Sequence, residues 1–175
     1  AQKSLLARYK KFITTIVLGF IVFLACVESV FVVMATPFAV SNVYHQQFQM
    51  HRFLTEIYNK PVAVNDLGWT SFRNNNYVLD FWGLGSTRAR MLRQTESNVL
   101  WMDKLAAEKD VKLVMIYTTA NWFPKVPEGW IKLAELDVSG PRITVLQAVA
   151  FFARDKQDVP LLKQQLQQFK ALLPQ

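Results

Sequence analysis

One long apolar run near the N-terminus limits the folds that this chain can adopt. Residues 12–35 carry a single charged side chain, Glu28. A helix needs about 20 apolar residues to cross the hydrocarbon core of a bilayer, and this run has about 24. It is too long for the apolar part of a signal peptide, and no small-x-small cleavage motif ends it. The sequence therefore predicts a transmembrane helix over residues 12–36.

The charges around this run predict its orientation. Four basic residues, Lys3, Arg8, Lys10 and Lys11, lie in the flank formed by residues 1–11, whereas residues 37–50 contain no Lys or Arg. Cytoplasmic flanks of membrane helices are enriched in Lys and Arg. We expect the N-terminus in the cytoplasm, the helix in the cytoplasmic (inner) membrane, and the rest of the chain on the extracytoplasmic or periplasmic side.

Glu28 is the exception within the run. A carboxylate in hydrocarbon costs a few kcal/mol, so it tends to face other helices or a polar cavity. We expect Glu28 either to line a polar membrane cavity, with neighbouring helices from outside this chain, or to be protonated or to reach toward the interface.

Composition excludes several classes of function. The chain of 175 residues has a net charge of +7, but its basic residues are scattered and do not alternate with aromatic residues, so we expect no nucleic acid partner. The positive net charge fits a surface near anionic lipid head groups. The single cysteine, Cys26, lies inside the apolar run and has no second cysteine with which to form an intrachain disulfide. His45 and His51 are six residues apart and do not share a helical face, so no metal site is predicted.

A second helix is expected between the membrane and the domain. Pro37 is predicted to end the membrane helix, and Ser41 or Asn42 to cap an amphipathic connecting helix within residues 37–60. Helical periodicity predicts which of its side chains are buried. The predicted buried face comprises Val43, Met50, Leu54 and Ile57, and most of the polar residues Gln46, Gln49, Arg52 and Glu56 are expected to lie off this face.

The remaining residues, 61–175, predict one extracytoplasmic α/β domain. About five strands alternate with helices, which favours a mixed sheet with helices packed against it. The first three strands should be parallel and the last two antiparallel. The predicted strands are residues 62–65, 77–82, 111–118, 130–138 and 143–153, and the predicted helices are 86–94, 97–109 and 158–173, the first of them capped by Ser86.

Two aspartates end the first two predicted strands. Asp66 and Asp80 would therefore lie where an α/β sheet opens its crevice, and they could bind a hydroxyl-rich ligand or a cation. The alternative is structural: Asp66 would cap the short helix 67–72, and Asp80 would accept hydrogen bonds from loop amides.

Aromatic residues accompany these aspartates. Trp69 and Trp82 lie at loop level, where they could stack on sugars or reach the lipid interface, or simply pack. Gly83-x-Gly85 resembles the start of a phosphate-binding loop, but the third glycine is missing, which disfavours a nucleotide site. No catalytic triad is visible, and no catalytic residue is assigned.

The segment from Tyr44 onward resembles a family. It is similar to the C-terminal region of GT-C type integral-membrane glycosyltransferases, which use polyprenyl-phosphate sugars as donors. The resemblance lies in the Gln46-Gln47-x-Gln49-Met50 helix, in Val62 to Asp66 followed by Gly68, and in Asp80-x-x-Gly83-Leu84. Trp69 stands where the family has a small residue.

The resemblance implies that the chain is the last membrane helix and the extracytoplasmic domain of a larger enzyme. Its partners would be the bilayer, further transmembrane helices upstream, a polyprenyl-phosphate sugar, and a glycan or lipid acceptor. The catalytic carboxylate of this family lies in the first extracytoplasmic loop, and neither it nor the divalent cation that usually assists would be held by this chain. The alternative is a single-span protein whose non-catalytic domain binds a glycan, a lipid or a partner.

Overall fold

The structure, a computed structural model, describes residues 2–119, 121–138, 140–144 and 148–174, with side chains from residue 8. Ser139 and residues 145–147, which belong to a predicted turn and to the last predicted strand, lie outside the described residues. The helical elements, some of them π-helical or 3₁₀, are α1 Gln2–Val43, η1 Tyr44–Phe48, α2 Gln49–Arg52, η2 Phe53–Tyr58, α3 Gly68–Ser71, α4 Thr87–Thr95, α5 Leu100–Glu108, η3 Lys156–Asp158 and α6 Val159–Lys170. The strands are β1 Val62–Val64, β2 Val78–Asp80, β3 Leu113–Tyr117, β4 Ile131–Leu136 and β5 Val149–Ala153.

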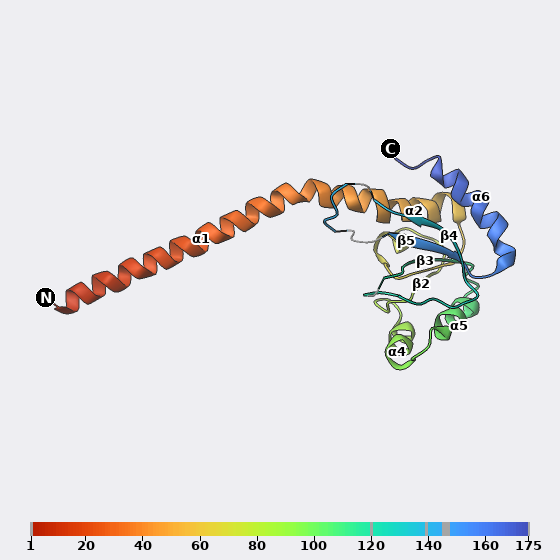
Figure 1. Ribbon diagram of the computed structural model, residues 1–175, viewed down its shortest axis with the longest axis horizontal. Coiled ribbons are helices and arrows are strands. Elements are labelled where there is room, and N and C mark those ends of the chain that lie inside the picture. Colours follow the sequence, from red (N-terminus) through yellow and green to blue (C-terminus); the bar gives the residue numbers. More distant parts are fainter. Residues whose placement is uncertain (1, 120, 139, 145–147, 175) are drawn as a thin grey trace.

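The N-terminal helix α1 is long and apolar enough to cross a membrane, as its sequence predicts. It projects from the domain (Figure 1). Its apolar side chains between Phe12 and Met34 are exposed. The predicted break at Pro37 is wrong, because α1 continues through this residue to Val43 and joins η1 directly. A proline removes one helical hydrogen bond, which kinks a helix without necessarily ending it.

The connecting segment presents a buried stripe that helical periodicity predicted only in part, at Met50 and Leu54. Asn42, Gln46, Met50, Leu54 and Tyr58 are all buried. In an α-helix, residues spaced by four drift around the axis, whereas the wider π-turns of η1 and η2 keep this spacing on one side. The expectation that Gln46 and Gln49 avoid the buried face is therefore wrong, since both have no exposed surface.

The domain is α/β, as predicted, with a mixed sheet in the strand order β2-β1-β3-β5-β4. Strands β1, β2 and β3 are parallel, and β5 is antiparallel to both β3 and β4, which confirms the predicted directions. The near-continuous apolar sequence of β3, LVMIY, is buried throughout because both sheet faces are covered.

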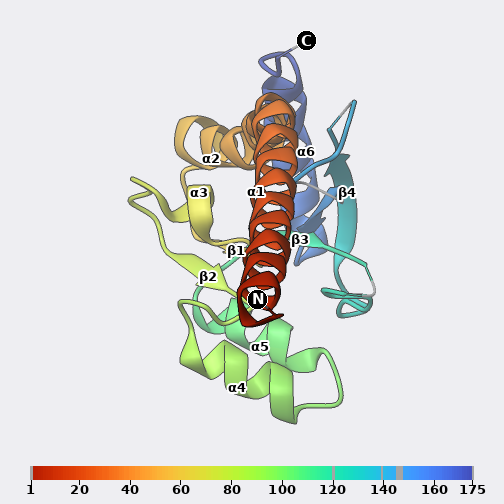
Figure 2. The same cartoon turned by 90° about the vertical axis from the view of Figure 1, so that its left-hand side faces the viewer.

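Helices cover the two faces of the sheet and form a three-layer sandwich. Figure 1 shows α2 and α6 on one side of the sheet and α4 and α5 on the other, and Figure 2 shows the same layers end on. Each face carries its own apolar core. On the first side, Phe53 packs against both Phe151 and Phe169. Phe81 packs against Trp101 and Trp130 on the second.

The loop between β4 and β5 fastens the domain to the end of α1. The last strand begins at Val149, later than the predicted residue 143. Ile143 and Thr144 instead donate their backbone amides to Oδ1 of the buried Asn42, at 2.7 and 3.4 Å. Nδ2 of Asn42 donates to the Pro141 carbonyl at 2.9 Å. The membrane helix and the domain therefore share one hydrogen-bonded joint.

Candidate functional site

The candidate site lies at the carboxyl ends of the parallel strands. The strands β2 and β3 lie on opposite sides of β1. The chain therefore passes from β1 to β2 on one side, and β3 later pairs with β1 on the other side. Such a switch in direction leaves a crevice at the strand ends, where α/β proteins commonly bind ligands. Helical segments η1 to η2 run antiparallel to β3: Gln46 contacts Tyr117 at its carboxyl end, and Tyr58 lies beside Leu113 at its start. The crevice therefore faces the end from which α1 leaves.

Asp66 follows β1 and is partly buried in this crevice. Its Oδ2 accepts hydrogen bonds from Gln47 Nε2 at 3.1 Å and from the Tyr117 hydroxyl at 3.3 Å. The helix-cap alternative for Asp66 is wrong, since α3 has no side-chain cap and begins after Leu67. The carboxylate is held by the connecting helix and β3, and its Oδ1 accepts no hydrogen bond from the described residues.

Tyr117 links two polar side chains at the crevice, those of Gln46 and Asp66. Its buried hydroxyl lies 3.0 Å from Gln46 Oε1 as well as beside Asp66. Burial, reinforced by the negative charge of Asp66, raises the pKa of Tyr117 well above its ordinary value, so the phenol stays protonated and able to donate. Sequence reasoning missed Tyr117 and Gln47, although the paired glutamines on a helix otherwise rich in apolar residues were a visible signal.

Asp80 has the structural role that the sequence left open for it. Its two oxygens accept hydrogen bonds from the backbone amides of Trp82, Gly83 and Gly85, at 2.8, 3.0 and 2.7 Å. These bonds fold the loop that leads into α4, whose cap Ser86 accepts from the Ala89 amide as predicted. Asp80 is buried and committed to this loop, so it does not share a ligand position with Asp66.

The predicted tryptophans belong to two different groups. Trp82 packs on Trp122, with ring centroids 4.5 Å apart, and carries the Arg93 guanidinium over its face at 3.8 Å. Trp122 in turn lies 5.5 Å from the Tyr117 ring. This row of rings, the aromatic row Tyr117–Trp122–Trp82, crosses from the end of β3 to the end of β2 and so passes the end of β1.

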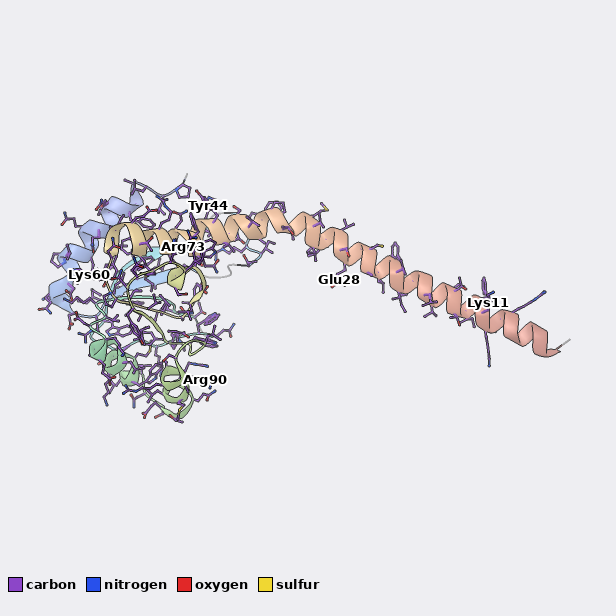
Figure 3. The ribbon with its side chains drawn as sticks, turned by 180° about the vertical axis from the view of Figure 1, so that it is seen from behind. Lys11, Glu28, Tyr44, Lys60, Arg73 and Arg90 are labelled. Carbon is purple, nitrogen blue, oxygen red and sulfur yellow. The ribbon has the colours of Figure 1, made fainter. Side chains whose placement is uncertain are left out.

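Trp69 lies elsewhere, in an exposed group beside the connecting helix. Its ring contacts Phe48 at 5.2 Å, Phe72 at 5.6 Å and His51 at 5.9 Å. Figure 3 shows Tyr44 and Arg73 close to this region, near the point where α1 enters the domain. Trp69 and Phe72 are 38% and 51% exposed, which leaves an aromatic surface on the same side as the membrane helix.

Glu28 stands apart from all of these residues. Figure 3 shows it on the part of α1 that projects clear of the domain, where its side chain is exposed. Within the described part of the chain nothing bonds to its carboxylate. His45 interacts with Ser41, and His51 with the aromatic group. In residues that the structure describes, no group of three or more His, Cys, Asp or Glu side chains is arranged to hold a metal ion.

Comparison with known proteins identifies a family for this chain. Neither the curated proteins nor the solved structures contain a match to this chain. A family model described as "Domain of unknown function (DUF8728)" matches residues 40–159, which is more than half of the chain and includes every site residue named above except Glu28. The chain therefore belongs to the DUF8728 family.

Proposed function

We propose that this chain is the last membrane helix and the extracytoplasmic C-terminal domain of a membrane glycosyltransferase. The enzyme would transfer a sugar from a polyprenyl-phosphate carrier at the outer face of the cytoplasmic membrane. The domain would form the acceptor side of the site and would not supply the catalytic groups. The carboxylate base and any divalent cation would be held by upstream parts of the protein.

The observation that carries this proposal is the direction of the sheet. The carboxyl ends of β1 and β3, with Asp66 and Tyr117, lie against η1, the segment that directly continues the membrane helix. Gln46 lies 11 residues beyond Ala35, or about 16 Å along a helix that rises 1.5 Å per residue. A sugar displayed on a lipid phosphate at the membrane surface would therefore approach the strand ends and not the back of the domain. The similarity of residues 44–84 to the GT-C type enzymes supports the same function.

The proposal is tested in two steps on the full-length gene product. First, the reading frame should encode many further apolar spans upstream of Ala1. Second, membranes containing this protein should release polyprenyl phosphate from one of a panel of synthetic polyprenyl-phosphate hexoses and pentoses. Asp66→Ala should slow transfer to the acceptor while donor hydrolysis continues, and Glu96→Ala, which changes an exposed carboxylate on α4's C-terminal side, should transfer at the normal rate.

A second candidate function has an observation of its own. Gln47 and the Tyr117 hydroxyl both donate to one oxygen of Asp66, and the same hydroxyl contacts Gln46; a carboxylate held in this way suits a binding domain better than a reaction centre. A single-span protein with a non-catalytic domain for a glycan, a lipid or a partner is the alternative. A reading frame that starts at this helix, or a protein that consumes no donor, would replace the glycosyltransferase proposal with this one.

A further inference from the structure

Polar atoms at the end of β1 lack partners in the structure. Asn65 is 2% exposed, yet its Nδ2 has no hydrogen-bond partner among the described residues. The buried Oε1 of Gln47 has none either. Buried polar groups are rarely left unpaired, because each costs the free energy of its lost hydration. Together with the open Oδ1 of Asp66, these atoms define the β1-end site.

The chemical character of these atoms is fixed by the bonds that the same side chains already make. Oδ1 of Asn65 accepts from the Tyr117 backbone amide at 2.9 Å, so the opposite atom must be the amide nitrogen, a donor. Gln47 Nε2 donates to Asp66, which leaves its oxygen as an acceptor. The β1-end site therefore offers one donor, Asn65 Nδ2, and two acceptors, Gln47 Oε1 and Asp66 Oδ1.

The charge of the β1-end site selects the class of ligand. None of the ion pairs formed by described residues includes Asp66, so its negative charge is not balanced by a neighbouring Lys or Arg. A phosphate or carboxylate ligand would be repelled. A sugar ring suits these groups, because each hydroxyl can both donate to a carboxylate or amide oxygen and accept from an amide nitrogen.

The aromatic row supplies an apolar surface next to these polar groups. The strand order places the end of β1 between β3, which ends at Tyr117, and β2, which leads into Trp82. Trp122 contacts both rings and is only partly buried. Backbone bonds from Phe123 N to Tyr117 O at 3.2 Å and from Trp122 N to Thr119 O at 3.0 Å fold the loop back and hold the ring there. Aromatic rings beside hydrogen-bonding groups suit the mixed apolar and polar surface of a sugar.

We propose that the β1-end site binds a neutral sugar through two adjacent hydroxyl groups, with Trp122 against the ring. One hydroxyl would donate to Asp66 Oδ1 or Gln47 Oε1, and its neighbour would accept from Asn65 Nδ2. The identification of this sugar as part of the acceptor rests on the proposed function. The binding of a neutral sugar does not, and it applies equally to a non-catalytic glycan-binding domain.

The experiment titrates the full chain in lipid nanodiscs with D-mannose, D-glucose, D-galactose and L-arabinose, each raised into the millimolar range. Tryptophan fluorescence and the side-chain amide NMR signal of Asn65 report binding. We expect at least one sugar to shift both signals. Asn65→Asp keeps the acceptor for the Tyr117 amide but replaces the donor, and it should weaken binding about tenfold or more, the effect of losing one hydrogen bond and adding a second carboxylate.

Two further variants make the result decisive. Asn98→Asp is the matched control: Asn98 is exposed, its Oδ1 accepts from the Leu100 amide, and an aspartate preserves that bond. Trp122→Phe should reduce the fluorescence response while the chain stays folded. This variant therefore tests the site independently if the Asn65→Asp protein does not fold. The proposal is overturned if none of the four sugars shifts either signal, or if Asn65→Asp binds as Asn98→Asp does.

The outcomes also separate this proposal from the glycosyltransferase proposal. Sugar binding by a protein that consumes no polyprenyl-phosphate donor would leave the β1-end site intact and refute the enzyme. Transfer activity with an unchanged acceptor KM in Asn65→Asp, and no sugar binding to the chain, would refute the site and leave the enzyme.

Discussion

Tyr117→Phe is the sharpest test of the polar crevice, because it deletes one atom from the group that ties the connecting helix to the sheet. The lost hydroxyl lies 3.0 Å from Gln46 Oε1 and 3.3 Å from Asp66 Oδ2, and it has one proton to donate. Removing a donor from a buried polar group costs about 1–3 kcal/mol. With a urea dependence of about 2 kcal/mol per molar, the unfolding midpoint should fall by about 0.5–1.5 M.

The measurement is urea unfolding of the full chain in detergent micelles, followed by tryptophan fluorescence. Tyr77→Phe is the matched control, since Tyr77 is 46% exposed and its hydroxyl makes no hydrogen bond within the described chain. An exposed substitution of this kind should change the free energy of unfolding by less than about 0.5 kcal/mol. If Tyr117→Phe and Tyr77→Phe unfold at the same urea concentration, the crevice contributes nothing to the attachment of the helix.

Three further predictions follow from the same geometry. Burial raises the pKa of Tyr58 and Tyr117 in the folded chain, so above pH about 10 these tyrosines ionise in the unfolded chain but not in the folded one. The free energy of unfolding should therefore fall by up to about 1.4 kcal/mol per pH unit for each tyrosine. Urea unfolding between neutral and alkaline pH measures this loss. Gly83→Ala should lower the free energy of unfolding by about 2–5 kcal/mol in the same assay, because its φ of 93° disfavours a side chain and a Cβ would collide with Arg90. Asn42→Ala should release the loop that it binds, so that trypsin cleaves after Arg142 many times faster.

Each of these has its own control. A free energy of unfolding that stays constant up to pH 11, or about one unit above the ordinary tyrosine pKa, would contradict the burial argument. Gly129→Ala should be nearly neutral, since a Cβ there meets nothing, and equal effects at Gly83 and Gly129 would contradict the close approach to Arg90. Ser41→Ala, next to Asn42 but exposed, should leave the trypsin cleavage rate unchanged. Equal cleavage in both variants would show that Asn42 does not hold the loop.

Local patterns were sufficient to predict most of the fold. The apolar run predicts α1, the continuous apolar segment LVMIY predicts a strand buried on both faces, and Ser86 marks the start of α4. These signals work because each depends on residues that are close in sequence. The ends of elements were less predictable: Ile143 has a strand-like sequence, but its backbone amide bonds to Asn42, about a hundred positions away.

The candidate site was only half visible in the sequence for the same reason. Asp66 and Asp80 were identified, but identical chemistry at two strand ends cannot show that one carboxylate folds a loop and the other faces a crevice. Gln46 and Gln49 were interpreted by α-helical periodicity, and the π-turns change that periodicity. Tyr117 gave no local signal, because its role depends on partners from β1 and from the connecting helix.

The unbroken helix from α1 to η2 has a mechanical consequence. A flexible tether would let the domain tumble above the bilayer, whereas this helix passes from the apolar run straight into the core at Met50 and Leu54. A rotation of the helix about its long axis would therefore rotate the whole domain, including the sheet, by the same angle. A neighbouring helix bound to the surface around Glu28 would therefore fix the direction that the carboxyl ends of the strands face.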